Sequence, residues 1–355
     1  MKTGLFGIEH SNRNVDDHWG KNCFNSSFPT SLACYMMEKK IPAIYVHLEP
    51  TRNLKNPVKI SCGSISMSDV FNCGDCKSSD LEFDFETAFH YYQQYAYDSL
   101  DNIDLVVCKD GKQIRPIEIK LTAFPDNTTA SKPKEEWGSE IVVRSATMMY
   151  CALGIFDSVS KAEGANKIRD CFEIACSSIS DWKNDYEVTH KLPMLLQKLN
   201  GFEALYYQYQ KPVLMQVLWK TKGKTPFLED DAFQVVIWSD FAFEKLVAVR
   251  CDDKADKMSR PMTATARLIN CLWELSKSGK INLASVYREL AYTNQNDKEF
   301  SVPGMSWRRF LKDADFSKFP VSKNALDELI DPAYIDKLSP ERRLDQTIFF
   351  TYKKK

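Results

Sequence analysis

Charged side chains interrupt two apolar β patterns near residue 110. Asp104 stands in the apolar run 103–108, and Glu118 and Lys120 stand in the run 114–121. Because side chains alternate along a strand, Glu118 and Lys120 share one face. Burying such charges costs free energy unless they are paired or bind something. The pattern therefore predicts a functional site on two neighbouring strands.

The spacing of an acid, any residue and a lysine is not informative by itself. The chain repeats it at 38–40, 75–77, 110–112, 181–183 and 252–254. Only the copy at 118–120 lies in an apolar β pattern that follows a second such pattern with its own embedded acid, Asp104. This context singles out Asp104, Glu118 and Lys120.

The chemistry of these groups indicates a site for a divalent cation. Two carboxylates, Asp104 and Glu118, and the backbone carbonyl of Ile119 are hard oxygen ligands suited to Mg²⁺, which completes its shell with water and phosphate. Such an ion polarises a phosphodiester and lowers the pKa of water. Lys120 would hold the attacking water and stabilise the charge that develops on phosphate. We therefore expect hydrolysis of a nucleic-acid backbone.

The register of the hairpin decides whether these groups can meet. A regular two-residue loop at Asp110-Gly111 would pair Ile103 with Glu118 and place Asp104 on the opposite face. A three-residue loop or a β-bulge would pair Asp104 with Glu118. We therefore predict an irregularity, with Pro116 as a suitable place because proline cannot donate to the ladder.

Glu86 is expected to be the fourth member of the site. The spacing of aromatic residues over 82–98 predicts a helix, from which Glu86 would approach the metal or its water, with Glu82 one turn earlier as the competitor. A solvated helix acid is the alternative interpretation.

The remaining patterns predict an α+β fold with a mixed central sheet flanked by helices. We expect helices at 30–39, from the Ser139 N-cap to about 153, onward to 209, at 261–277 and at 283–291, and strands at 42–48, 213–219 and 233–238. Three parts are expected, namely an N-terminal extension or cap (1–80), a nuclease core (81–252) with a helical insertion (155–210), and a mostly helical C-terminal region (253–355).

Composition excludes several classes of protein. The 355 residues are 44% hydrophobic with a net charge of −1, so the chain can bury a core and is not disordered. No apolar segment is long enough to span a bilayer, and the N-terminus lacks an apolar signal region. Eleven cysteines, an odd number, favour a reducing compartment, so a cytoplasmic location is expected. Cys73 and Cys76, with Cys62 upstream, lack the further ligands of a structural zinc site.

The arrangement Glu86, Asp104 and Glu118-Ile119-Lys120 resembles the PD-(D/E)XK nuclease superfamily, although Ile103 replaces the usual proline. Longer segments are similar to the HindVP family of type II restriction endonucleases. They are GIEHSNR (7–13), WGKNCFNSSFPTSLACYM (19–36), EIKLTAFPDNTT (118–129) and VVRSATMMY (142–150).

The resemblance implies a Mg²⁺-dependent homodimer that cuts double-stranded DNA inside a GRCGYC palindrome. A palindrome implies two-fold symmetry in the protein that reads it. It also implies a restriction-modification system whose cognate DNA methyltransferase works with the enzyme without forming a stable complex. No membrane partner is expected.

Candidate DNA contacts follow from residue type and location. Lysines would meet phosphates, and an arginine could read guanine on its major-groove edge; the candidates are Lys132, Lys134, Arg144, Ser145, Lys220 and Lys222. Arg144 and Ser145 are expected on the helix after the catalytic strand, where an ion pair between Arg144 and Glu140 is the alternative. The lysines at 220–224 could instead protect a strand edge. His10, Asn12 and Arg13 are candidates for recognition, dimer contacts or a simple cap.

Two other functions fit the same residues. The first is a repair or junction nuclease of the same superfamily, which would lack palindrome specificity. The second is a non-catalytic DNA-binding protein, with a helix-turn-helix around Ser278-Gly279 and an internal salt bridge between the strand charges. A methyltransferase is disfavoured because no glycine-rich loop follows a strand.

Overall fold

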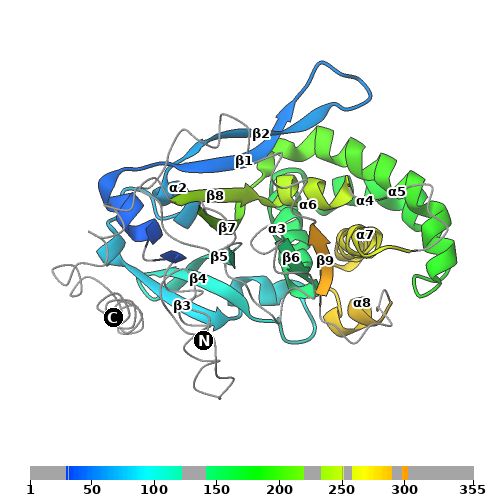
Figure 1. The fold of residues 1–355 in the computed structure, drawn as a ribbon. Coiled ribbons are helices and arrows are strands. Elements are labelled where there is room, and N and C mark those ends of the chain that lie inside the picture. The colour runs from blue at the N-terminus through cyan, green and yellow to red at the C-terminus, as the bar shows by residue number, and fades with distance from the viewer. Residues whose placement is uncertain are drawn as a thin grey trace, which may run out of the picture.

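A seven-stranded mixed sheet forms the centre of the protein (Figure 1). The computed structural model describes residues 29–30, 32–121, 141–219, 233–249, 251, 258–289 and 298–302. The strand order is β2-β1-β8-β7-β5-β4-β3, with β5 parallel to β7, β1 parallel to β8 and the other pairs antiparallel. The strands are β1 (Ala43–Pro50), β2 (Val58–Ile65), β3 (Leu81–Thr87), β4 (Ile103–Lys109), β5 (Lys112–Leu121), β7 (Pro212–Trp219) and β8 (Phe233–Ser239).

Helices follow the sheet strands and gather mainly on one side of the sheet (Figure 1). They are α2 (Met67–Phe71), α3 (Ser145–Glu163), α4 (Ala165–Cys176), α5 (Asp185–Tyr206), α6 (Asp240–Ala248), α7 (Arg260–Ser278) and α8 (Leu283–Glu289), with 3₁₀ turns η1 (Ser78–Asp80), η2 (His90–Tyr95) and η4 (Tyr207–Tyr209). A separate two-stranded sheet pairs β6 (Ile141–Arg144) with β9 (Lys298–Val302). The predicted mixed α+β class is confirmed.

Each face of the large sheet carries its own apolar core. Alternate residues of β8 divide between the two, since Val236 and Trp238 pack into the cluster that includes α3, α6 and α7. Val235 and Ile237 pack into the other cluster, with α2 and the helical residues 32–36. Strands covered on both faces are mostly apolar, as the sequences of β7 and β8 are.

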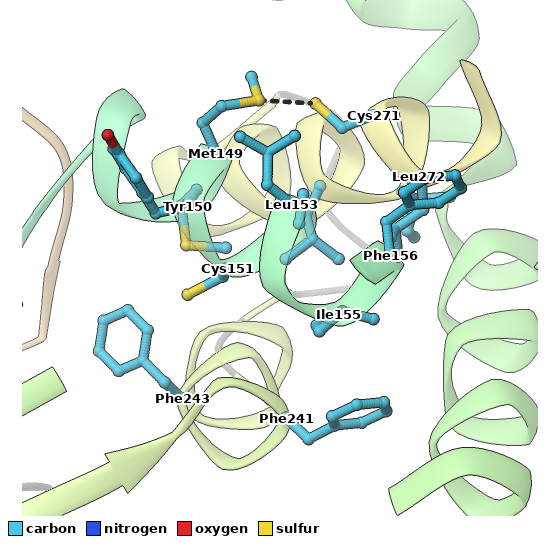
Figure 2. Packing of buried hydrophobic residues seen from close by; sticks show 14 of the residues in the cluster. Met149, Tyr150, Cys151, Leu153, Ile155, Phe156, Phe241, Phe243, Cys271 and Leu272 are labelled. Carbon is cyan, nitrogen blue, oxygen red and sulfur yellow. Dashed lines mark hydrogen bonds between the residues drawn. The ribbon is translucent and has the colours of Figure 1, made fainter. Parts of the chain in front are cut away.

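Helix α3 is the central helix of the larger core. Figure 2 shows it packed between α6 and α7, with Phe241 and Phe243 on the first and Cys271 and Leu272 on the second. The thiol of Cys271 lies 3.7 Å from the sulfur of Met149. Helix α3 is buried at every residue from Thr147 to Val159, so most of its length packs against neighbouring elements.

Most predicted elements are confirmed. In the described part of the N-terminal segment, residues 32–39 are helical and β1 is the expected strand. The hairpin, the pair β7 and β8, the helices between 145 and 206, and the two C-terminal helices α7 and α8 also agree. Strands β1 and β2, which lie before residue 81, extend the same sheet as the later strands, while the proposed domain boundaries stay a prediction.

The expected helix at 82–98 is wrong. Residues 81–87 form β3, and η2 follows at His90–Tyr95. The segment has helical spacing between Phe85, Phe89 and Tyr92, but Phe83 and Phe85 also alternate with acids, as in a half-buried strand. Pairing with β4 fixes the strand form, because Phe83 and Phe85 then pack into the core.

Two further expectations need correction. The helix predicted from Ser139 instead begins at Ser145, because residues 141–144 form strand β6. Its partner β9 lies in the C-terminal region that was expected to be helical. In this pairing the β-branched run Ile141–Val143 can form backbone hydrogen bonds with β9. The pairing joins segments that lie more than a hundred residues apart in the sequence.

Two glycines, one that caps a helix and one inside a helix, allow a matched test of backbone conformation. Gly279 ends α7 with φ of 73°, whereas Gly201 lies inside α5, and a Cβ at either site would meet no atom within 4 Å. Gly279→Ala is therefore expected to destabilise the protein by about 1 kcal/mol. Gly201→Ala is expected to stabilise it by about 0.5–1 kcal/mol. Urea unfolding measures both, and equal shifts of the same sign would contradict the conformational argument.

Among the described helices, none combines the length and apolar character required to cross a membrane. The ten cysteines in the described ranges are free thiols, including Cys62, Cys73 and Cys76.

Candidate active site

The hairpin that carries the predicted site contains one extra residue. Its turn is tight, since Lys109 pairs with Lys112, and Asp110 and Gly111 have φ of 52° and 70°. The register then shifts, so that Cys108 faces Gln113 but Val107 faces Arg115. The unpaired residue is Ile114, two positions before Pro116. The predicted irregularity is thus confirmed as a β-bulge.

The bulge aligns the two predicted carboxylates. Beyond it, Leu105 faces Ile117, and the same register places Asp104 opposite Glu118, on the same face of the sheet. The backbone N–H of Ile119 donates to Oδ2 of Asp104 at 2.7 Å. From Glu118 onward β5 pairs in parallel with β7. The structure therefore brings Asp104 and Glu118 together where β5 begins to pair with β7.

Glu118 is held by two donors on one oxygen. The ammonium of Lys120 contacts Oε1 of Glu118, and the hydroxyl of Thr147 in α3 donates to the same oxygen at 2.9 Å. Glu118 is 7% exposed, whereas the Lys120 side chain is 18% exposed. No described residue donates a hydrogen bond to Oε2 of Glu118 or Oδ1 of Asp104.

Burial and the neighbouring charge of Glu118 both act on the carboxyl of Asp104. Burial, and next the charge of Glu118, raise the pKa of Asp104 to about 7, although Lys120 and the Ile119 N–H oppose the rise. Two carboxylates at close range in a desolvated site repel each other when both are ionised. A divalent cation between their free oxygens would remove that repulsion, so the donor set fits Mg²⁺.

Glu86 lies on a strand beside Asp104. Its neighbours in β3, Phe85 and Thr87, pair with the residues on either side of Asp104. Glu86 is exposed, has φ of 50° and contributes to the raised pKa of Asp104. A non-glycine residue with positive φ is strained, which favours a functional hypothesis.

The competitor Glu82 lies farther away, because it pairs with Cys108 near the other end of β4. Within the described ranges, no three His, Cys, Asp or Glu side chains are grouped so that they could hold a metal ion. Among the described residues, Asp104 and Glu118 are therefore the carboxylates that the hairpin register brings together, and the role of Glu86 stays a prediction.

Sequence reasoning missed two polar residues near this site. Thr147 contacts Glu118, and Gln216 in β7 is the register partner of Lys120. Gln216 is fully buried; its Oε1 accepts from the indole N–H of Trp238 at 3.3 Å, and its Nε2 has no hydrogen-bond partner among the described residues. A lone amide in an apolar strand was the available signal for Gln216.

The candidate DNA contacts are only partly placed. Arg144 is the last residue of β6 and Ser145 the first of α3, so Arg144 lies on a strand and not on the expected helix. Ser145 is half-buried, two residues before Thr147. Several other candidates lie outside the described residues, together with Glu140; they are Lys132, Lys134, Lys220, Lys222, His10, Asn12 and Arg13.

Comparison with known proteins gives a consistent result along the whole chain. The HindVP restriction endonuclease family matches residues 19–354. The type II restriction enzyme HgiDI of Herpetosiphon aurantiacus is 32% identical, over 98% of this chain and 96% of that protein. The probable type II restriction enzyme HindVP of Haemophilus influenzae is 31% identical, over 98% and 94%. No solved structure matches the chain.

Proposed function

Because the chain belongs to the HindVP restriction endonuclease family, we propose that it hydrolyses double-stranded DNA with Mg²⁺, using a PD-(D/E)XK site formed by Asp104, Glu118 and Lys120. Its two relatives are type II restriction enzymes, or probable ones, that match over nearly their full length. These similarities support a type II restriction endonuclease function. The metal, the site residues and the DNA sequence are the proposed parts.

The register of the hairpin is the observation that carries the site. The bulge at Ile114 places Asp104 opposite Glu118, and each carboxylate keeps one oxygen that accepts no hydrogen bond from a described residue. These two oxygens and the carbonyl of Ile119 would hold Mg²⁺. When bound, the ion would polarise the scissile phosphate and acidify a water molecule.

Lys120 performs the remaining chemistry in this proposal. Its ammonium has three donors, of which one reaches Glu118. In the proposed mechanism this ammonium would orient the attacking water and stabilise negative charge on the phosphate. Glu86, exposed beside Asp104, is proposed to accept a hydrogen bond from water at the edge of the site.

The proposed recognition of DNA rests on the family. We expect a homodimer that reads a GRCGYC palindrome, with a cognate methyltransferase that protects host DNA. A two-fold symmetric protein suits a palindromic site because each subunit meets the same half-site. Arg144, Ser145 and the lysines at positions 132, 134, 220 and 222 stay proposed as DNA contacts.

Cleavage of plasmid DNA tests the proposed function. The protein with Mg²⁺ is expected to give discrete fragments, and EDTA or Glu118→Gln is expected to abolish them. Glu173→Gln is the matched control, because Glu173 is an exposed residue of α4. Smearing or structure-selective nicking would favour another nuclease of the superfamily. A retarded but uncut band would favour a DNA-binding protein.

A further inference from the structure

Thr147 contributes a buried hydroxyl to the site from a different part of the fold. It is the third residue of α3 and is 2% exposed. Threonine hydroxyls in helices often bond back to a carbonyl of the preceding turn. Here the hydroxyl instead donates to Oε1 of Glu118 in β5, at 2.9 Å. The contact therefore links the first turn of α3 to the carboxylate.

We propose that Thr147 is a positioning residue that fixes the rotation of the Glu118 carboxylate. Thr147 and Lys120 both contact Oε1, which leaves Oε2 as the oxygen available to a cation. Lys120 alone is a weak constraint, because its stem is flexible and its ammonium also serves the substrate in the proposed mechanism. The hydroxyl of Thr147 comes from a packed helix and has no such second task.

The surroundings of Thr147 strengthen this constraint. Its neighbours Met148 and Cys151 are buried in the larger core, so α3 cannot shift without opening that core. Groups that hold a metal-binding side chain in place typically change metal affinity 10- to 100-fold when they are lost. The inference rests on the proposed function only in naming a divalent cation as the ligand of Glu118.

Two substitutions separate the hydroxyl from the packing of the side chain. Thr147→Val keeps the shape and removes the hydroxyl, whereas Thr147→Ser keeps the hydroxyl. Binding of Mn²⁺, followed by the loss of its free EPR signal, is expected to weaken about 10- to 100-fold in Thr147→Val. In Thr147→Ser we expect it to stay within about threefold of the parent. The Mg²⁺ concentration for half-maximal cleavage should move in parallel, while DNA binding in EDTA stays unchanged.

Each possible result bears on the inference. Equal weakening in Thr147→Val and Thr147→Ser would overturn it, because packing would then be the cause. Parent-like Mn²⁺ binding in Thr147→Val, or no Mn²⁺ binding by the parent, would also overturn it. The parent could bind Mn²⁺, and Thr147→Val but not Thr147→Ser could weaken that binding, while no DNA is cut. In that case the positioning role stands and the proposed function fails. Thr147→Ala replaces Thr147→Val if the latter does not fold by circular dichroism.

Discussion

Lys120→Met is expected to lower the rate of DNA cleavage by about 10²–10³-fold, the usual cost of losing one preorganised donor to a transition state. The loss should appear in the rate of the chemical step, because Lys120 is proposed to act on the attacking water and the phosphate. Affinity for DNA should change only a few-fold. Linearisation of supercoiled plasmid with enzyme in excess measures the rate, and a gel shift in EDTA measures binding.

Two other lysine variants sharpen this test. Lys120→Arg keeps the charge but replaces a compact ammonium with a planar group, so we expect partial activity. Lys167→Met is the matched control, because Lys167 is exposed on α4, and it should cut at the parental rate. A rate for Lys120→Met within tenfold of the parent would remove Lys120 from the chemical step. Urea unfolding identifies any loss of folded protein, since Lys120 also pairs with Glu118.

Local sequence patterns were sufficient to predict the strands that are buried on both faces and the helix with clear start and stop signals. Strands β7 and β8 are apolar runs covered on both faces, and α7 carries a proline near its start and a glycine at its end. Such signals are contained in the residues themselves. They predicted these elements without knowledge of their neighbours in the sheet.

Pairing partners decided the segments that sequence reasoning missed. Phe85 fits both a period of two with Phe83 and a helical spacing with Phe89, and only the pairing of β3 with β4 selects the strand. Strand β6 pairs with β9, which lies more than 150 residues later in the chain. A local pattern carries no information about a partner at that distance.

Part of the candidate site could be predicted from local sequence patterns. Its charged strand residues stood out against apolar neighbours, and the geometry required an irregular hairpin. The bulge itself falls at Ile114 and not at the expected Pro116, which pairs regularly with Val106. The contact of Thr147 with Glu118 depends on how α3 docks on the sheet, so it could be found only in the folded structure.

A second buried charge cluster, formed by Glu203, Glu244 and Lys245, should control the stability of the fold. The ammonium of Lys245 contacts Glu203 and also donates to Oδ1 of Asn200 at 3.1 Å. Burial raises the pKa of Glu203 even though Lys245 opposes the rise. Burial and the neighbouring Glu203 raise the pKa of Glu244 well above its usual value.

Lys245→Met is therefore expected to destabilise the protein by about 3–5 kcal/mol near neutral pH, the typical cost of breaking a buried pair. Both carboxyls have raised pKa values in the folded state. Their contribution to stability is complete below the unfolded pKa, about 4.3, and is lost as pH rises through the folded values. Without Lys245 the folded pKa of Glu203 rises further, so the destabilisation should be small near pH 4 and grow toward pH 8.

Glu244→Gln is the control for Lys245→Met, because it is expected not to destabilise the protein. The buried carboxyl of Glu244 receives no hydrogen bond from a donor group of the described residues, and the carboxyl of Glu203 raises the pKa of Glu244 through its charge and a side-chain hydrogen bond. The ammonium of Lys245 contacts Glu203. Replacing the carboxyl of Glu244 with a neutral amide should be neutral or stabilising by about 1–2 kcal/mol near pH 8, and the free energy of unfolding should change less between pH 4 and pH 8. Urea unfolding between pH 4 and 8 measures both variants. A loss in Lys245→Met that is the same at every pH would assign it to packing of the lysine stem, because only a charge effect disappears when the carboxyls are protonated.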